Sequence, residues 1–187
     1  PLSLPDTIVS IGTGAFGGCE GLTGPLVLPK GLQSLEGYAF FGCTGLTGAL
    51  TLPAGVTALG PGAFQGCSGL AGPVTLAPGL TAIGDSAFEG CAKLAGPLEL
   101  PASLERIGSF AFYGCGRLTG DLMVPEGVKF VGASAFERCV KLGPTVTLPA
   151  SLVKLGTGAF TLTRGVKQFQ GISPSGKPWA SLLTGAP

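Results

Sequence analysis

Residues 50–73 read LTLPAGVTALGPGAFQGCSGLAGP, and this 24-residue pattern recurs along most of the chain. Alanine and phenylalanine return together in each unit, and cysteine follows the phenylalanine three residues later in the first six units. No insertion or deletion breaks the spacing from Leu2 to Phe160. Self-similarity at a fixed period of this length is the signature of a solenoid. We therefore predict that residues 1–160 form about seven repeats, and that residues 161–187 form a C-terminal cap and tail. The phenylalanines that set the period are Phe16, Phe40, Phe64, Phe88, Phe112, Phe136 and Phe160.

Each unit begins with the pattern of a short, half-buried strand. Leu50 and Leu52 alternate with Thr51, which is the period of a strand with one buried face. Pro53 ends this strand because it has no N–H to continue the ladder. Stacked units would place these strands about 4.8 Å apart in a parallel sheet along one side of the solenoid.

The second half of the unit has a different spacing. Val56 and Leu59 are predicted as a buried pair before a corner at Gly60. Apolar residues of segment 63–70 then recur at intervals of three and four, which suits a short helical or 3₁₀ turn. The predicted fold class is therefore an α/β-type repeat solenoid, with a short-stranded parallel sheet and short helical or 3₁₀ turns.

Residues 98–118, LELPASLERIGSFAFYGCGRL, resemble the BspA-like, or treponemal-type, leucine-rich repeat family. The pattern of that family is close to L-x-L-P-x-x-L-x-x-I-G-x-x-A-F-x-G-C-x-x-L, and the resemblance extends from Leu2 to about Phe160. Departures occur at Ala77-Pro78, where the usual order is inverted, at Glu36 in place of a corner glycine, and at Arg138 in place of glycine. The resemblance implies a curved right-handed solenoid used for recognition. It also implies a location at the cell surface or in secreted form.

The cysteine column has two readings. Neighbouring units would bring the cysteines to about 5 Å from one another, which is within the range of a disulfide. Their Cβ atoms would nevertheless point in parallel into the core, so a column of small apolar side chains is favoured. A metal site is not expected, because the chain has no histidine and no C-x-x-C pair.

The sequence offers no catalytic constellation, and we expect neither an enzyme nor a cofactor. Without histidine, neither a Ser-His nor a Cys-His dyad can be built. Residues 12–17 match G-x-G-x-x-G only because repeat columns coincide there, and no full helix is expected to follow. Glu20, Glu36 and Asp85 occupy variable surface columns and would not converge as an acid/base pair.

Charge is distributed unevenly along the chain. Residues 1–92 contain one basic and five acidic residues, for a net charge of −4, whereas residues 93–187 contain ten basic and five acidic residues, for a net charge of +5. This asymmetry fits either an ordinary solvated surface or a basic end that docks on an acidic protein or an anionic surface. Nucleic acid is not an expected partner, because the basic end lacks interleaved aromatic residues.

The middle residue of each L-x-L strand should point outward, on the face where leucine-rich repeats commonly bind. Inward positions must fit the column, while outward positions are available for recognition. We therefore predict that another protein binds this face or the ends of the solenoid, with basic residues assisting. The candidate protein-binding residues are Val27, Thr51, Thr75, Glu99, Met123 and Thr147 on the outward column, and Lys154, Arg164 and Lys167 at the basic end.

The sequence leaves alternatives open for the role of each end of the chain. After Phe160 the pattern breaks, and Trp179, Leu182 and Leu183 are expected to cap the last repeat or, alternatively, to form an arm that anchors to a partner. Pro1 stands in mid-repeat, which leaves open whether an N-terminal cap or targeting segment belongs to the protein. The functional hypothesis is a non-catalytic protein-binding scaffold or recognition module. The alternative is a structural subunit built permanently into a larger protein complex, for which a membrane-associated location is left open.

Overall fold

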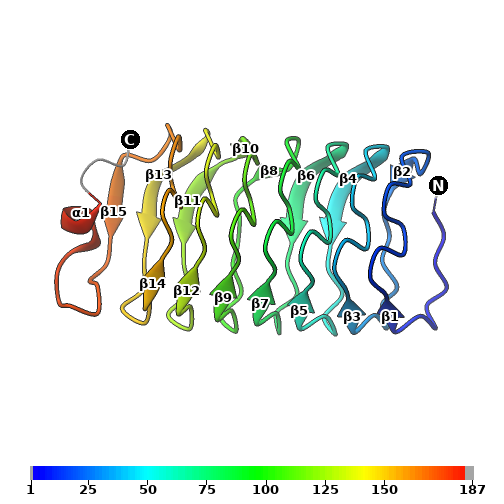
Figure 1. Cartoon of the computed structure of the whole chain (residues 1–187), viewed down its shortest axis with the longest axis horizontal. Helices are drawn as coiled ribbons and strands as arrows, with labels where there is room; N and C mark the ends of the chain where they lie inside the picture. The colour runs from blue at the N-terminus through cyan, green and yellow to red at the C-terminus, as the bar shows by residue number, and fades with distance from the viewer. Residues whose placement is uncertain (1, 184–187) are drawn as a thin grey trace.

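The computed structural model describes residues 2–183, in which the chain winds into coils that stack side by side in one row (Figure 1). One two-residue strand from each coil joins a single seven-stranded parallel sheet, which confirms the predicted solenoid. These strands lie along the lower edge of Figure 1, and we call this side of the stack the short-strand face. In chain order they are β1 (Ser10–Ile11), β3 (Ser34–Leu35), β5 (Ala58–Leu59), β7 (Ala82–Ile83), β9 (Arg106–Ile107), β12 (Phe130–Val131) and β14 (Lys154–Leu155).

A second side of the stack, the long-strand face, carries strands at several of the predicted L-x-L positions, whereas residues 2–4, 26–28 and 98–100 lie outside the described strands. It is divided into small parallel sheets with the orders β2-β4-β6, β10-β8 and β11-β13-β15. The first of these sheets contains a backbone irregularity: Gly48 has a φ of 79°, and the register between β4 and β6 shifts between Gly48 and Leu50. The strands are β2 (Gly24–Pro25), β4 (Leu46–Thr51), β6 (Leu70–Thr75), β8 (Ala95–Gly96), β10 (Arg117–Leu118), β11 (Gly120–Met123), β13 (Leu142–Thr147) and β15 (Gln168–Gln170).

The third side, the turn face, comprises residues 61–67 and their equivalents in the other coils, and here the expected helical or 3₁₀ turns are not confirmed. Gly62 and Gly66 have φ values of 59° and 75°, in the left-handed region, so a continuous right-handed helix cannot form. The N–H of Phe64 donates instead to the carbonyl of Ala87 in the next coil, at 2.8 Å. Successive turns thus bond along the solenoid axis, and the α/β description is replaced by that of a parallel β-solenoid.

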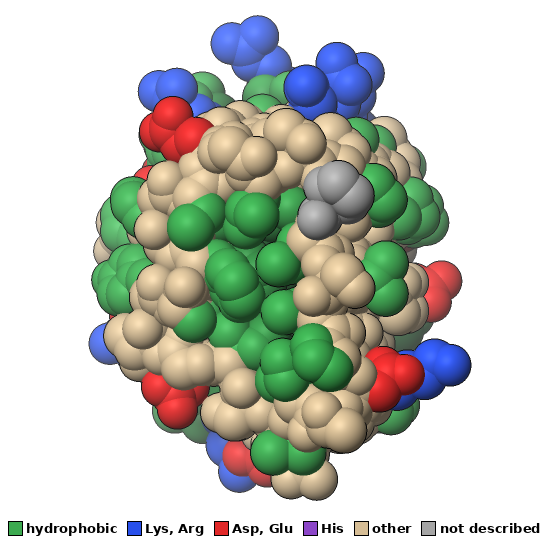
Figure 2. Space-filling model, turned by 90° about the vertical axis from the view of Figure 1, so that its right-hand side faces the viewer, with side chains coloured by type: hydrophobic (Ala, Val, Ile, Leu, Met, Phe, Trp, Pro, Cys, Tyr) green, Lys and Arg blue, Asp and Glu red, His purple; other side chains and the backbone are tan. Residues whose placement is uncertain are grey.

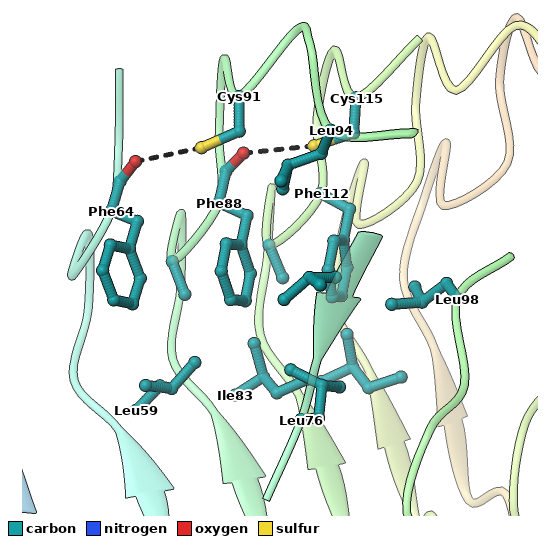
Figure 3. Packing of buried hydrophobic residues seen from close by; sticks show 14 of the residues in the cluster. Leu59, Phe64, Leu76, Ile83, Phe88, Cys91, Leu94, Leu98, Phe112 and Cys115 are labelled. Carbon is teal, nitrogen blue, oxygen red and sulfur yellow. Dashed lines mark hydrogen bonds between the residues drawn. The ribbon is translucent and has the colours of Figure 1, made fainter. Parts of the chain in front are cut away.

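The core is a column of stacked phenylalanine rings. Adjacent rings from Phe16 to Phe160 have centroids 5.0–5.6 Å apart and interplanar angles of at most 13°. Figure 3 shows Phe64, Phe88 and Phe112 side by side, with aliphatic side chains packed around them. Offset stacking of this kind adds to the stabilisation from burial alone. Each coil is therefore held mainly by its two neighbours, as the solenoid architecture requires.

The N-terminal end of the stack presents apolar side chains in its middle and polar groups around its rim (Figure 2). Leu4, Ile8, Phe16 and Leu22 of the first coil are partly buried, whereas the equivalent rings from Phe40 onward are buried.

At the other end, the segment after Phe160 adds β15 to the long-strand face and then forms the one described helix, α1 (Trp179–Leu182). Trp179 is buried in the core cluster, Leu183 packs partly against it, and Leu182 is exposed. Residues 184–187 of the expected cap and tail lie outside the described residues.

Candidate binding surface

The strand register gathers the predicted outward column on the long-strand face. Thr51 lies beside Thr75, and Met123 lies beside Thr147, in parallel register. Their neighbours alternate as expected, since Leu50 is fully buried while Thr51 is exposed. The two most apolar members stand far out of the surface, with Val27 and Met123 each 70% exposed.

Three shallow grooves run along this column, between successive coils. The first is lined by Val27, Thr51 and residues around them and has a volume of about 530 Å³. The second, of about 410 Å³, includes Thr75 and Glu99. The third, of about 540 Å³, includes Glu99 and Met123. Five of the predicted column residues therefore line grooves, and Glu99 is shared by the second and third.

Prolines form the walls of all three grooves, which the sequence reasoning did not foresee. Pro25 and Pro53 line the first, Pro73 and Pro97 the second, and Pro97 and Pro125 the third. Each pair comes from neighbouring coils, so the walls exist only once the coils stack. Because a proline ring has a fixed φ, the backbone at these walls has restricted conformational freedom.

The outward column has one more member at its C-terminal end, which was not predicted from the sequence. Gln170 of β15 lies beside Thr147 in register and is exposed. The alternation of Gln168, Phe169 and Gln170 could have indicated a strand, but the segment had been assigned to the cap and tail because the repeat breaks before it.

The basic residues do not all join the column. Lys154 belongs to β14 on the short-strand face, where its Nζ lies 5.5 Å from the centre of the Phe130 ring. Lys167 borders the long-strand face, because its N–H donates to the carbonyl of Pro144, at 2.8 Å. Its Nζ also donates to the carbonyl of Arg164, at 3.0 Å, and both side chains are exposed. The structure thus places Arg164 and Lys167 beside the end of the column and Lys154 on another face.

The cysteine column has a structural role that the sequence reasoning only half identified. Cys43 to Cys139 are buried and not disulfide-bonded, whereas Cys19 is exposed. Each buried thiol donates to the carbonyl of a phenylalanine in the preceding coil, as in Cys91 to Phe64, at 3.1 Å (Figure 3). Burial raises the pKa of the Cys67 thiol to about 12. The buried thiols are therefore protonated hydrogen-bond donors that link coils, and not thiolate nucleophiles.

Other kinds of site find little support in the described part of the chain. Within residues 2–183, no group of three or more cysteine or acidic side chains is placed to hold a metal ion. Over the same residues, no helix has the length and apolar character that crossing a bilayer requires.

Comparisons with known proteins point to one family of leucine-rich repeat proteins. The family model described as BspA type leucine rich repeat region (6 copies) matches residues 1–96 and 81–173. A leucine-rich repeat protein of T. pallidum is 37% identical, with a TM-score of 0.69 over 78% of this chain and 68% of that chain. One from Bacteroides ovatus is 31% identical, with a TM-score of 0.65 over 81% of this chain and 40% of that chain. A leucine-rich cell surface protein from Faecalibacterium prausnitzii is 22% identical, with a TM-score of 0.47 over 90% of this chain and 59% of that chain. No curated protein sequence matches the chain.

Proposed function

The chain belongs to the BspA-type leucine-rich repeat family, and on that premise we propose that it is a non-catalytic recognition module that binds another protein on its long-strand face. The observation that carries the proposal is the row of three grooves beside Val27, Thr51, Thr75, Glu99 and Met123. A rigid surface loses little conformational entropy on binding, which favours affinity. The proline walls and strand backbones supply that rigidity.

The chemistry of the grooves favours a partner with apolar protrusions. Leu26 and Leu28 lie at the first groove together with the exposed Val27, so the groove is apolar in its middle. Met123 gives the third groove a flexible, polarisable rim that adapts to different side chains. Glu99, between the second and third grooves, would accept a hydrogen bond from the partner. A protein surface that presents spaced apolar side chains and a central donor fits this pattern.

Long-range attraction from the basic end would assist an acidic partner, or an anionic surface that carries the partner. Arg164 and Lys167 border the long-strand face and would act on approach to the grooves. Lys154 points from another face and would contribute only to the overall field. We also propose a location at the cell surface or in secreted form, for which the support is the family resemblance.

A display library of natural protein fragments provides the test. Fragments selected on the wild-type chain are purified, and their affinities for wild type, Val27→Glu and Met123→Glu are measured by biolayer interferometry. The matched control is Val153→Glu, which makes the same change at an exposed position outside the grooves, beside β14. We expect the two groove variants to weaken binding about ten-fold or more, which is about 1.4 kcal/mol, and the control to have no effect. Selected partners that depend on Val153 and not on the grooves would reject the proposal and favour a structural subunit held by other surfaces.

The contribution of charge is tested separately with the selected partner. Charge reversal at Arg164 and Lys167 should slow association more than it accelerates dissociation, because rim charges act mainly on the encounter rate. The association rate of wild type should also fall as salt rises beyond physiological ionic strength, where the Debye length is about 8 Å. An association rate that is independent of salt would show that the basic end does not attract the partner over a long range.

A further inference from the structure

The turn face carries two aromatic pairs that the grooves do not involve, in which Tyr38, Phe41 and Phe110 are exposed and Tyr113 is half-buried. Tyr38 and Phe41 are 47% and 44% exposed, with ring centroids 6.1 Å apart and an angle of 77° between their planes. Phe110 and Tyr113 repeat the arrangement, with centroids 5.8 Å apart and an angle of 65°. The two pairs occupy the same positions of the repeat, three coils apart, which corresponds to about 14 Å along the solenoid at the usual strand spacing.

The backbone at these pairs is in a conformation that aromatic residues seldom adopt. Tyr38 and Phe110 each have a φ of 56°, in the left-handed region. In the two coils between them the equivalent residues are small, Gly62 with a φ of 59° and Ser86 with a φ of 57°. A bulky residue in this region costs roughly 1–3 kcal/mol, and such costs are concentrated at functional sites. Glycine would relieve the strain without altering the coil, so the two rings at this position indicate a function on the surface.

The rings are also held in place. A Cβ atom at Gly62 would lie 2.5 Å from Cδ1 and Cε1 of Tyr38, so the Tyr38 ring rests over the bare backbone of the next coil. At the other pair, the guanidinium carbon of Arg138 lies 5.7 Å from the centre of the Tyr113 ring. Each pair therefore has a supported ring, and the exposed surface of the pair faces solvent as a fixed platform.

Polar groups bridge the space between the two pairs. In the two intervening coils, Nε2 of Gln65 donates to Oε2 of Glu89, at 2.9 Å, and both side chains are half-buried. The four turn-face segments from 37–43 to 109–115 contain acidic residues but no lysine or arginine. The guanidinium groups that reach the strip from other segments are engaged, since Arg106 pairs with Asp85 at 3.4 Å and Arg138 lies beside the Tyr113 ring. The balance of charge along the strip therefore disfavours a polyanion such as nucleic acid or a sulfated chain.

We propose that the turn face binds a neutral glycan chain, with the Tyr38–Phe41 and Phe110–Tyr113 pairs as two stacking platforms. The faces of a pyranose ring carry C–H groups that pack on aromatic rings, and its rim carries hydroxyl groups that hydrogen-bond to amides and carboxylates. A short extended oligosaccharide spans the distance between the pairs and places hydroxyl groups over Gln65 and Glu89. An apolar protein surface would fit less well, because the polar bridge interrupts the apolar contact. This site lies on a different face from the grooves and does not depend on protein binding there.

The test is affinity electrophoresis of the whole chain in gels that contain one soluble neutral polysaccharide each: mixed-linkage β-glucan, xyloglucan, galactomannan or arabinoxylan. Heparin serves as the anionic comparison. The variants are Tyr38→Gly and Phe110→Gly, alone and combined, which remove the platforms and adopt the residue that other coils carry at this position. The matched control is Val153→Glu, at an exposed position beside β14 that lies outside both the turn face and the grooves. Thermal melts by circular dichroism accompany each variant, and we expect no loss of stability, because glycine removes the strain.

We expect at least one neutral polysaccharide to retard wild type and Val153→Glu, and retardation to weaken about ten-fold or more in the double glycine variant. Three results would overturn the proposal: no retardation by any of the four neutral polysaccharides, retardation by heparin alone, or retardation that the double variant retains. Marked destabilisation of the glycine variants would overturn the argument from strain. A protein fragment whose binding is lost in the double variant, with no polysaccharide affected, would assign the face to a protein instead.

Discussion

Truncation of Phe88 to alanine tests the phenylalanine column that links the coils. The ring is fully buried and stacks on Phe64 and Phe112, with centroid distances of 5.5 and 5.2 Å. Removing a buried phenylalanine side chain costs about 3–5 kcal/mol in general. Two stacked neighbours each add about 0.5–1.5 kcal/mol beyond burial. We therefore expect Phe88→Ala to lower the free energy of unfolding by an amount near the upper end, about 4–5 kcal/mol.

The matched control is the same truncation at Phe16, which lies at the end of the phenylalanine column. Phe16 is only partly buried and stacks on one neighbour, Phe40, with a centroid distance of 5.0 Å. The same truncation at Phe16 should cost about 2 kcal/mol, because less apolar surface is re-exposed and one stacked pair is lost. Phe88→Leu keeps most of the apolar volume and should cost about 1–2 kcal/mol. Thr51→Ala, on the outward column, should stay within about 0.5 kcal/mol.

Urea unfolding followed by far-ultraviolet circular dichroism measures all four variants against wild type. The slope of the transition must be compared as well, because a weakened central interface can uncouple the two halves of a solenoid and broaden the transition. The reasoning is refuted if Phe16→Ala costs as much as Phe88→Ala, or if Thr51→Ala costs more than either.

Three further predictions concern the backbone and the thiols. Gly132→Ala should cost about 3 kcal/mol or more, because a Cβ atom there would lie 2.2 Å from the backbone N of Ser109, whereas Gly21→Ala, with open space around it, should be nearly neutral in the same urea assay. In native protein, a maleimide reagent should label Cys19 rapidly and leave Cys91 protected until unfolding, as read by mass spectrometry; rapid labelling of Cys91 would contradict its burial. The free energy of unfolding should fall as pH rises above about 9, because burial raises the pKa of the Cys91 thiol well above its ordinary 9.0 and the unfolded state loses that proton first. A serine in place of Cys91 should make this decline less steep, and an unchanged slope would exclude the thiol as its cause.

The repeat itself could be predicted because its constraints are local to the sequence. A column of identical phenylalanines needs one residue type at one interval, and that interval is visible without a structure. The outward column was predictable for a similar reason, because the alternation around Thr51 shows which side chain leaves the core.

The elements that were missed depend on contacts between coils. The spacing of three and four in segment 63–70 mimics a helix, but the N–H of Phe64 bonds to the next coil and the left-handed glycines break the helical path. The strand Ala58–Leu59 is too short to show an alternation, although it belongs to the one sheet that includes all seven coils. The grooves likewise form only when prolines from neighbouring coils meet.

A structure of the chain bound to a partner selected on it tests most directly whether the long-strand face is the protein-binding surface. The account predicts that apolar side chains of the partner fill the grooves, with contacts to Val27, Thr51 and Met123 and a hydrogen bond to Glu99. A complex in which these residues remain open to solvent, and the partner is held by the ends of the stack or by the short-strand face, would contradict it.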